Sequence, residues 1–300
     1  MSLVQLALLF SQLLSPSHNR GALALRAVES VLKSNNPSIE IIVVEDQTSS
    51  AEEWLREHIK SGNIKYFCRD DGNNSTSQTR NLGVKLAAGK FILFLDDDDI
   101  LMPEYLECLP EIYQKNDVSW GFCDQLMNGK ITKNRMPVSG FSLTQNFKKY
   151  KARLSAGFWI KRSLFLEMGG LDVNLSLDED TDLCCRLMAR GHIPYYSRMI
   201  GVIYSRNDGE IRLTNSTEKN VTMACYLRTL EKNFDPLKPV KGDRDYLLHR
   251  THKFISETGN FSYLRAFDKF QKPKIISVIF FFRILKYRMK NFLHPPNART

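Results

Sequence analysis

Two runs of apolar residues, each followed at once by acidic residues, constrain the fold of this chain more than any other feature. Residues 39–44 read Ile-Glu-Ile-Ile-Val-Val and lead into Glu45 and Asp46, and residues 91–95 read Phe-Ile-Leu-Phe-Leu and lead into four aspartates at 96–99. A short, nearly continuous apolar run is typical of a strand that is covered on both faces. Both runs therefore predict buried strands of a parallel sheet.

Helical and strand-like segments alternate through the first 100 residues, which predicts an α/β fold with a doubly wound, mostly parallel sheet flanked by helices. We expect strands at 6–14, 39–44, 64–68 and 91–95 and helices at 22–32, 51–60 and 79–88, the last closed by Gly89. Sheets of this kind bind ligands beyond the carboxyl ends of their strands. The acids at 45–46 and 96–99 are therefore expected to meet at one edge.

The pattern becomes mixed from about residue 100 and helical from about residue 215. We expect one α/β domain over 1–212, with halves of about 1–100 and 101–212, and a helical basic region over 213–300. The formal net charge is +9, and residues 238–300 hold 14 Lys or Arg against 4 Asp or Glu. This basic end predicts an anionic phospholipid surface or a phosphorylated lipid carrier as partner, and no nucleic acid.

Four consecutive carboxylates repel one another, and a bound cation removes that repulsion. Mg²⁺ and Mn²⁺ prefer oxygen ligands, commonly one or two carboxylates together with the phosphates of a substrate. On an extended chain Asp96 and Asp98 project to the same side, with Asp97 on the other. The run predicts a metal clamp made by Asp96 and Asp98. For Asp99 the alternative is a cap for the next helix, which Pro103 helps to start.

Five segments, in their order and spacing, resemble the family-2 glycosyltransferases of the GT-A fold. They are Ser-Pro-Ser-His-Asn-Arg at 15–20, Ala-Val-Glu-Ser-Val-Leu at 27–32 with Ile-Ile-Val-Val-Glu-Asp at 41–46, Thr-Arg-Asn-Leu-Gly at 79–83, Phe-Leu-Asp-Asp-Asp-Asp at 94–99, and Glu-Asp at 179–180 with Leu183 and Arg186. The resemblance covers about residues 10–210. It implies a GT-A-like fold and transfer of a sugar from a nucleotide donor.

The resemblance also implies roles on the donor side of the site. Ser17 and Asp46 would line the nucleoside pocket, where Asp46 would accept from a uracil-like base edge. Arg80 and Asp97 would contact the nucleotide sugar, Arg80 near its diphosphate. The alternatives are an ordinary turn residue at the end of a strand for Asp46 and an exposed helix residue for Arg80.

On the acceptor side the resemblance makes Asp180 the general base, with Glu179 beside it. Acids are also favoured by the dipole at the start of a helix, which is the alternative explanation of Asp180. Asp182 is expected to be a capping or surface acid. Trp159 could stack on an acceptor sugar or belong to the core, and the core is favoured because large aromatic side chains are usually well buried.

The expected activity is an inverting, metal-assisted transfer from a UDP-sugar to a glycan or a lipid-linked acceptor, with Mn²⁺ or Mg²⁺ at Asp96 and Asp98. A base-activated acceptor that displaces the nucleotide in one step inverts the anomeric centre. Two alternatives are a nucleotidyltransferase, which would release pyrophosphate, and a non-catalytic relative that binds sugar nucleotides or glycans. The expected location is the cytoplasm, with peripheral contact at the inner face of the membrane.

The sequence departs from the family pattern in three places, of which the first is an apolar first strand that starts earlier than usual and contains Gln12. Glu45 replaces the first of two aspartates, and residues 204–208 lack the histidine that many relatives use as a further metal ligand, although Asp208 could serve. The apolar segment 275–285 is too short to span a bilayer, and together with the cations after it this segment belongs to a tail over residues 272–300. We expect this tail to lie in a membrane interface, the alternative being a packed terminal helix.

Overall fold

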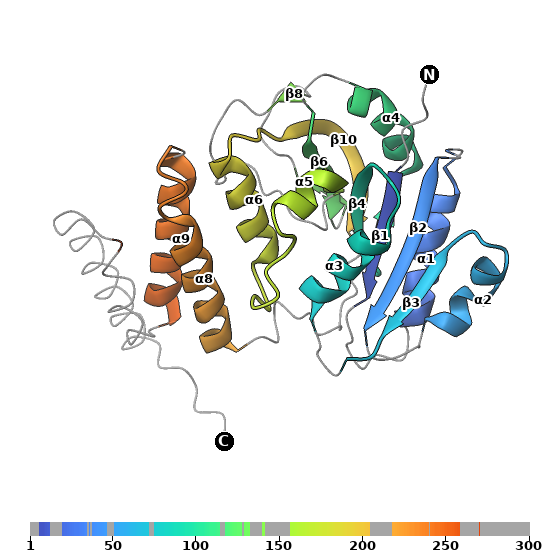
Figure 1. The fold of residues 1–300 in the computed structure, drawn as a ribbon, viewed down its shortest axis with the longest axis horizontal. Coiled ribbons are helices and arrows are strands. Elements are labelled where there is room, and N and C mark those ends of the chain that lie inside the picture. The colour runs from blue at the N-terminus through green and yellow to red at the C-terminus, as the bar shows by residue number, and fades with distance from the viewer. Residues whose placement is uncertain are drawn as a thin grey trace.

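The computed structural model describes residues 6–12, 20–34, 36, 38–46, 51–71, 75–114, 118–127, 129–132, 140–141, 157–204, 218–239, 241–258 and 270 (Figure 1). The strands are β1 Leu6–Gln12, β2 Ile39–Asp46, β3 Lys65–Arg69, β4 Phe91–Asp96, β5 Ile100–Leu101, β6 Trp120–Met127, β7 Lys130–Thr132, β8 Gly140–Phe141, β9 Trp159–Lys161 and β10 Tyr195–Tyr204. The helices are α1 Arg20–Leu32, α2 Glu52–Lys60, α3 Thr76–Leu86, α4 Pro103–Gln114, α5 Arg162–Glu167, α6 Glu179–Ala189, α8 Lys219–Asn233 and α9 Lys241–Thr258.

The strands form one mixed sheet in the order β3-β2-β1-β4-β9-β6-β10-β5. The first four strands of this order are parallel. Strand β9 is antiparallel to β4 and to β6, whereas β6 and β10 are parallel. This arrangement confirms the prediction of a mostly parallel, GT-A-like α/β sheet, and the short β9 joins its two halves.

Both faces of the sheet are covered, as the apolar runs predict. On β2, Ile42 and Val44 belong to one hydrophobic core, and Ile41 and Val43 belong to the other. The first core is completed by side chains of α3, α5, α6, α8 and α9, and the second by side chains of α1, α2 and α4. Figure 1 shows these two groups of helices on opposite sides of the strands.

The C-terminal helices pack into the first core. Leu230 of α8 and Leu247 and Ile255 of α9 are fully buried in the same cluster as Ile42. The predicted boundary at residue 212 lies outside the described residues, and the division into domains stays a prediction. The predicted membrane-contacting tail, residues 272–300, is also outside them. Among the helices that the structure describes, none is both long and apolar enough to cross a membrane.

Helix α3 begins and ends earlier than predicted. The hydroxyl of Ser75 accepts from the backbone N–H of Gln78 at 3.3 Å and caps α3, which begins at Thr76, three residues before the predicted start. At the other end, Ala87 is extended, with φ −70° and ψ 139°. The Glu40 carboxylate then accepts from the backbone N–H groups of Ala88 and Gly89. The prediction that Gly89 closes the helix is therefore wrong.

Candidate functional site

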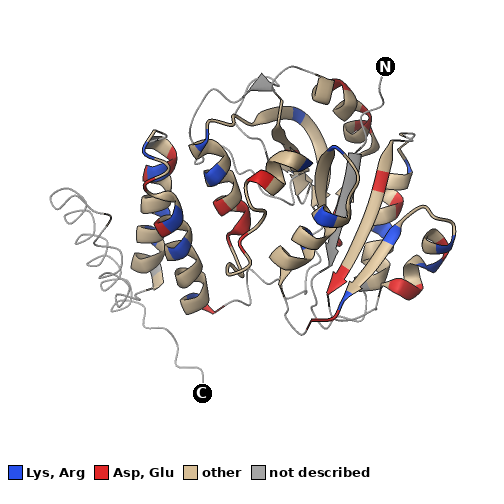
Figure 2. Ribbon diagram, viewed as in Figure 1, with Lys and Arg blue, Asp and Glu red and all other residues tan. Residues whose placement is uncertain are grey.

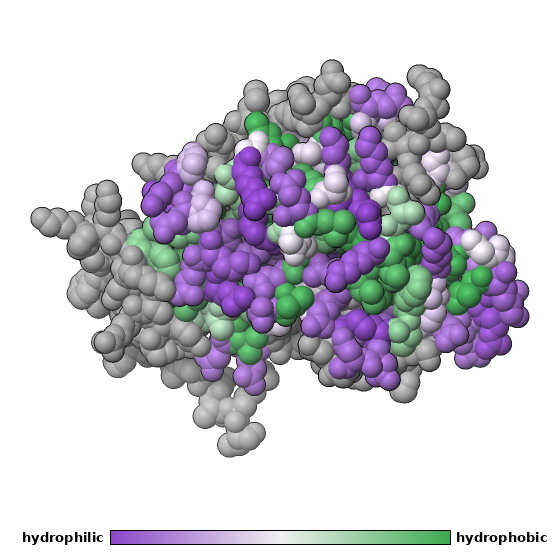
Figure 3. Space-filling view, viewed as in Figure 1, coloured by the Kyte–Doolittle hydropathy of each residue, from purple (hydrophilic) through white to green (hydrophobic). Residues whose placement is uncertain are grey.

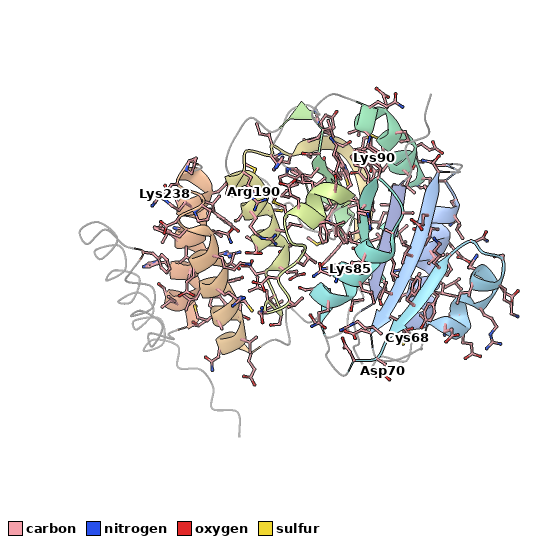
Figure 4. The ribbon with its side chains drawn as sticks, viewed as in Figure 1. Cys68, Asp70, Lys85, Lys90, Arg190 and Lys238 are labelled. Atoms are coloured by element: carbon pink, nitrogen blue, oxygen red, sulfur yellow. The ribbon has the colours of Figure 1, made fainter. Side chains whose placement is uncertain are left out.

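The parallel strands bring their acidic ends to one edge of the sheet. In the register of β1 with its neighbours, Gln12 pairs with Glu45 and Ser11 pairs with Asp96, so the ends of β2 and β4 flank β1. Figure 2 shows the acidic end of β2 at this edge, and in Figure 4 Cys68 and Asp70 lie at the same edge. Lys90, just before β4, lies at the opposite edge (Figure 4). The predicted meeting of the two acidic segments is confirmed.

The aspartate run forms a tight turn instead of an extended chain. Strand β4 ends at Asp96, and the backbone N–H of Asp99 donates to the carbonyl of Asp96 at 3.1 Å. Two side chains of helix α1 stabilise this turn. Arg26 donates to the carbonyl of Asp98 at 2.8 Å, and the Ser30 hydroxyl accepts from the N–H of Leu101 at 3.1 Å. The extended geometry used in the prediction is therefore wrong.

The turn nevertheless gathers three carboxylates. Asp96, Asp98 and Asp99 each offer one carboxylate oxygen, and these oxygens lie within 4.8 Å of one another. Asp99 is fully buried, and α4 begins only at Pro103, so capping does not account for Asp99. Three clustered carboxylate oxygens suit a hard divalent cation. Asp97 is also almost fully buried, and its predicted contact with a nucleotide sugar stays a prediction.

Arg80 joins the aspartate turn to helix α6. Its side chain is only 6% exposed, and its guanidinium lies 2.6 Å from Asp96 Oδ1 and 2.8 Å from Glu179 Oε1. Burial by itself lowers the pKa of Arg80, but the nearby carboxylates of Asp96, Glu179 and Asp180 outweigh it and raise that pKa. Arg80 is therefore no exposed helix residue, and it brings the predicted metal clamp and the predicted base into one site.

The start of α6 carries a strongly perturbed acid. Burial, together with the negative charge of the adjacent Asp180, raises the pKa of Glu179 from 4.5 to about 7, although Arg80 opposes the shift. Figure 2 shows the acidic residues at this end of α6, and in Figure 4 Arg190 marks its other end. A perturbed acid beside an ion pair and a carboxylate cluster is typical of a functional site.

This shift predicts a pH-dependent difference in stability between the protein and Glu179→Gln. Because the pKa of Glu179 is raised in the folded state, its stabilising contribution is complete below about pH 4.5 and is lost as the pH rises through about 7. We expect the variant to gain relative stability between pH 5 and 8, by up to about 3 kcal/mol at 1.36 kcal/mol per pKa unit. Denaturant melts in EDTA measure this. The exposed Glu167, replaced by Gln, is the control, and a pH-independent difference for Glu179→Gln would contradict the prediction.

Asp46 is held by the next strand and by the start of α3. It is fully buried, and its two carboxylate oxygens accept from Arg69 Nη2 at 2.7 Å and from the N–H of Ser75 at 3.0 Å. The neighbouring Glu45 accepts from the N–H of Ala51 at 3.1 Å. Asp46 therefore links the end of β2 to β3 and to the start of α3, which an ordinary turn residue at the end of a strand would not do. Sequence reasoning missed Arg69, although the parallel register places it opposite Asp46.

Asp182 is a buried centre of contacts and no surface acid. It is fully buried, and its oxygens lie 2.9 Å from Arg186, 3.0 Å from Lys232 and 2.9 Å from Asn233. The prediction of a capping or surface residue is wrong because α8 covers this side of α6. The spacing of Asp182 and Arg186, four residues apart on one helix, was the available signal.

The remaining predicted residues divide between the core and the undescribed segments. Trp159 is fully buried and packs edge-on against the stacked rings of Phe91 and Tyr113, at centroid distances of 5.9 and 5.0 Å. Stacking of Trp159 on an acceptor sugar is therefore excluded, and the core alternative is confirmed. Ser17 and the segment 205–208, with the candidate ligand Asp208, lie outside the described residues.

Comparison with known proteins gives a family match over the region that builds most of this site. Residues 13–167 match the model of the family described as glycosyl transferase family 2. A protein of Haemophilus influenzae named an uncharacterized glycosyltransferase is 26% identical over 277 residues, which is 87% of this chain and 90% of that protein. An Escherichia coli UDP-Glc:alpha-D-GlcNAc-diphosphoundecaprenol beta-1,3-glucosyltransferase is 27% identical over 145 residues, or 48% of this chain and 55% of that protein.

Solved structures share the fold at low sequence identity. The structure of Staphylococcus aureus TarS residues 1–349 in complex with UDP-GlcNAc superposes with a TM-score of 0.74 at 14% identity, over 98% of this chain and 93% of that one. A mannosyltransferase from Pyrobaculum calidifontis, in complex with GDP-Man and Mn²⁺, superposes with a TM-score of 0.61 at 11% identity, over 97% and 88% of the two chains. At these identities the superpositions establish a shared fold.

Proposed function

The chain belongs to glycosyl transferase family 2, and we propose that it transfers a sugar from a UDP-sugar to a hydroxyl group of a glycan or lipid-linked acceptor, with inversion at the anomeric carbon. The observation that carries this proposal is the double ion pair of Arg80 with Asp96 and Glu179. It joins a carboxylate cluster at the end of β4 to an acidic helix start on α6. The donor and acceptor named for the relatives above support the same chemical class.

The carboxylate cluster fits a divalent metal. Asp96, Asp98 and Asp99 would hold Mn²⁺ or Mg²⁺, which is the charge type and ligand type that such an oxygen cluster favours. When bound, the cation would neutralise the negative charge that develops on the departing diphosphate. The mannosyltransferase with bound Mn²⁺ supports this assignment.

Asp180 is proposed to take the proton from the acceptor hydroxyl as its oxygen attacks the anomeric carbon. Asp180 lies in the first turn of α6, beside Glu179, and its charge acts on Arg80. Attack from the side opposite the nucleotide breaks the bond to the diphosphate and inverts the configuration of the sugar. Asp46, held by Arg69, and Ser17 are proposed to line the nucleoside pocket.

The proposal is tested by incubating the protein with UDP-, GDP- and dTDP-sugars, with Mn²⁺, with Mg²⁺ and with EDTA. We expect release of a nucleoside diphosphate from a UDP-sugar in the presence of metal only. Once an acceptor is found, the NMR coupling of the product should show the opposite anomer to that of the donor. Release of pyrophosphate would indicate a nucleotidyltransferase. Absence of binding of any sugar nucleotide in calorimetry, with or without metal, would overturn the proposal.

A further inference from the structure

The residue before α6 has an unusual backbone conformation. Asp178 has φ 74° and ψ 11°, in the left-handed region, and is the one non-glycine residue with positive φ among those that the structure describes. An L-residue adopts this conformation at an energetic cost, so surrounding contacts must maintain it. Glu179 and Asp180 follow directly, and the orientation of the first turn of α6 depends on how Asp178 is held.

Arg250 of α9 holds Asp178 with two hydrogen bonds. Its Nη1 lies 2.5 Å from Oδ1 and its Nη2 lies 2.7 Å from Oδ2, which is the two-pronged geometry of a guanidinium on a carboxylate. The same Nη1 donates to the hydroxyl of Thr181 at 3.3 Å, one residue after Asp180. One side chain from the C-terminal region therefore contacts residues on both sides of the proposed base.

The ion pair between Arg250 and Asp178 is shielded from water. The Arg250 guanidinium carbon lies 4.2 Å from the ring centre of Tyr226 on α8 and 5.7 Å from that of Tyr246 on α9. The Arg250 and Asp178 side chains are only 14% and 5% exposed. A planar, permanently charged group between aromatic rings is well suited to a fixed position, and lysine cannot reproduce it.

The start of α6 is thus fixed at three points around Asp180. Arg250 holds Asp178, Arg80 holds Glu179, and side chains of α8 hold Asp182. In Figure 3 hydrophilic residues cover much of the visible surface near α6, whereas these charged contacts lie beneath that surface. We propose that Arg250 is a positioning residue, which acts through Asp178 to hold Asp180 in the orientation required for proton transfer.

This inference rests on the proposed function and adds a role for the C-terminal helices. The family match ends at residue 167, so neither Asp178 nor Arg250 lies within it. On this proposal helix α9 acts on the site through Arg250, which contacts Asp178 and Thr181. Its contribution is the cation that fixes the turn before the proposed base.

Arg250→Met tests the proposal, with Arg244→Met as the matched control. Arg244 lies on the same helix and packs on an aromatic ring, with its guanidinium carbon 5.1 Å from the ring centre of Phe234. We expect Arg250→Met to lower kcat by about 30- to 100-fold, because small displacements of a catalytic group have effects of this size, and to leave the donor KM nearly unchanged. Arg250→Lys should recover part of kcat, and Arg244→Met should retain kcat.

A second measurement does not depend on turnover. Amide hydrogen exchange should accelerate across residues 178–183 in Arg250→Met and remain slow there in Arg244→Met.

A double-mutant cycle tests whether Arg250 acts through Asp178. Asparagine at position 178 tolerates the left-handed backbone but loses the ion pair, so the kcat defect of Asp178→Asn should not add to that of Arg250→Met. Unchanged exchange at 178–183, additive defects, or equal losses of kcat in the two Arg→Met variants would each overturn the inference. If the unmodified protein bound no sugar nucleotide, the proposed function would fail, whereas the hydrogen-exchange measurement would still test whether Arg250 fixes the start of α6.

Discussion

Asp180→Asn is expected to lower kcat for sugar transfer by about 100- to 10,000-fold, the usual contribution of a general base. Asparagine has nearly the same shape as aspartate but cannot accept the proton of the acceptor hydroxyl. The donor should bind nearly as before, because the substitution leaves Asp96, Asp98 and Asp99 and the ion pair between Arg80 and Asp96 in place. Initial rates over a range of donor and acceptor concentrations give kcat and both KM values.

Two variants make the result for Asp180 specific. Asp235→Asn changes an exposed aspartate in the turn after α8 and should behave like the unmodified protein. Asp180→Glu keeps the carboxylate but displaces it, and should retain more activity than Asp180→Asn. A rate for Asp180→Asn within a few-fold of the original would exclude Asp180 as the base and direct attention to Glu179, whose raised pKa also suits proton transfer.

The sheet could be predicted from the sequence because its strands are short and buried on both faces. Apolar runs at 39–44 and 91–95 have few other stable arrangements, and parallel pairing then brings their acidic ends together. Helical spacing of apolar residues likewise located α1 and α2, the helices before and after β2 in the chain. The ends of the helices depend on information that periodicity does not contain, such as the Ser75 cap of α3.

The site was predicted less completely because its geometry depends on contacts between distant residues. Arg80 and Glu179 are 99 positions apart, and no local pattern indicates their ion pair. The turn at Asp97 brings the carboxylate of Asp99 close to those of Asp96 and Asp98, whereas an extended chain would hold Asp99 away from them. Burial of Asp182 follows from the packing of α8, which the sequence does not specify.

Asp98→Ala is expected to lower kcat/KM for the donor by about 1,000-fold in saturating Mn²⁺. A metal ion contributes several kcal/mol to transition-state stabilisation in such sites, and each 1.36 kcal/mol is a factor of ten. Asp98 lies in the turn itself, and its backbone carbonyl accepts from Arg26. The substitution therefore removes one ligand oxygen and leaves the contact that anchors the turn in place.

Metal binding can be measured apart from activity by comparing melting temperatures with and without Mn²⁺. Mn²⁺ binds the folded protein, so it should raise the melting temperature of the unmodified protein and of Asp235→Ala. In Asp98→Ala this rise should be mostly lost. In EDTA, the same variant should be at least as stable as the unmodified protein, because one of three mutually repelling carboxylates has been removed. An equal Mn²⁺-induced rise in Asp98→Ala and the unmodified protein would show that the cluster does not hold the metal through Asp98. Loss of stability in EDTA would instead mean that the side chain of Asp98 serves the fold.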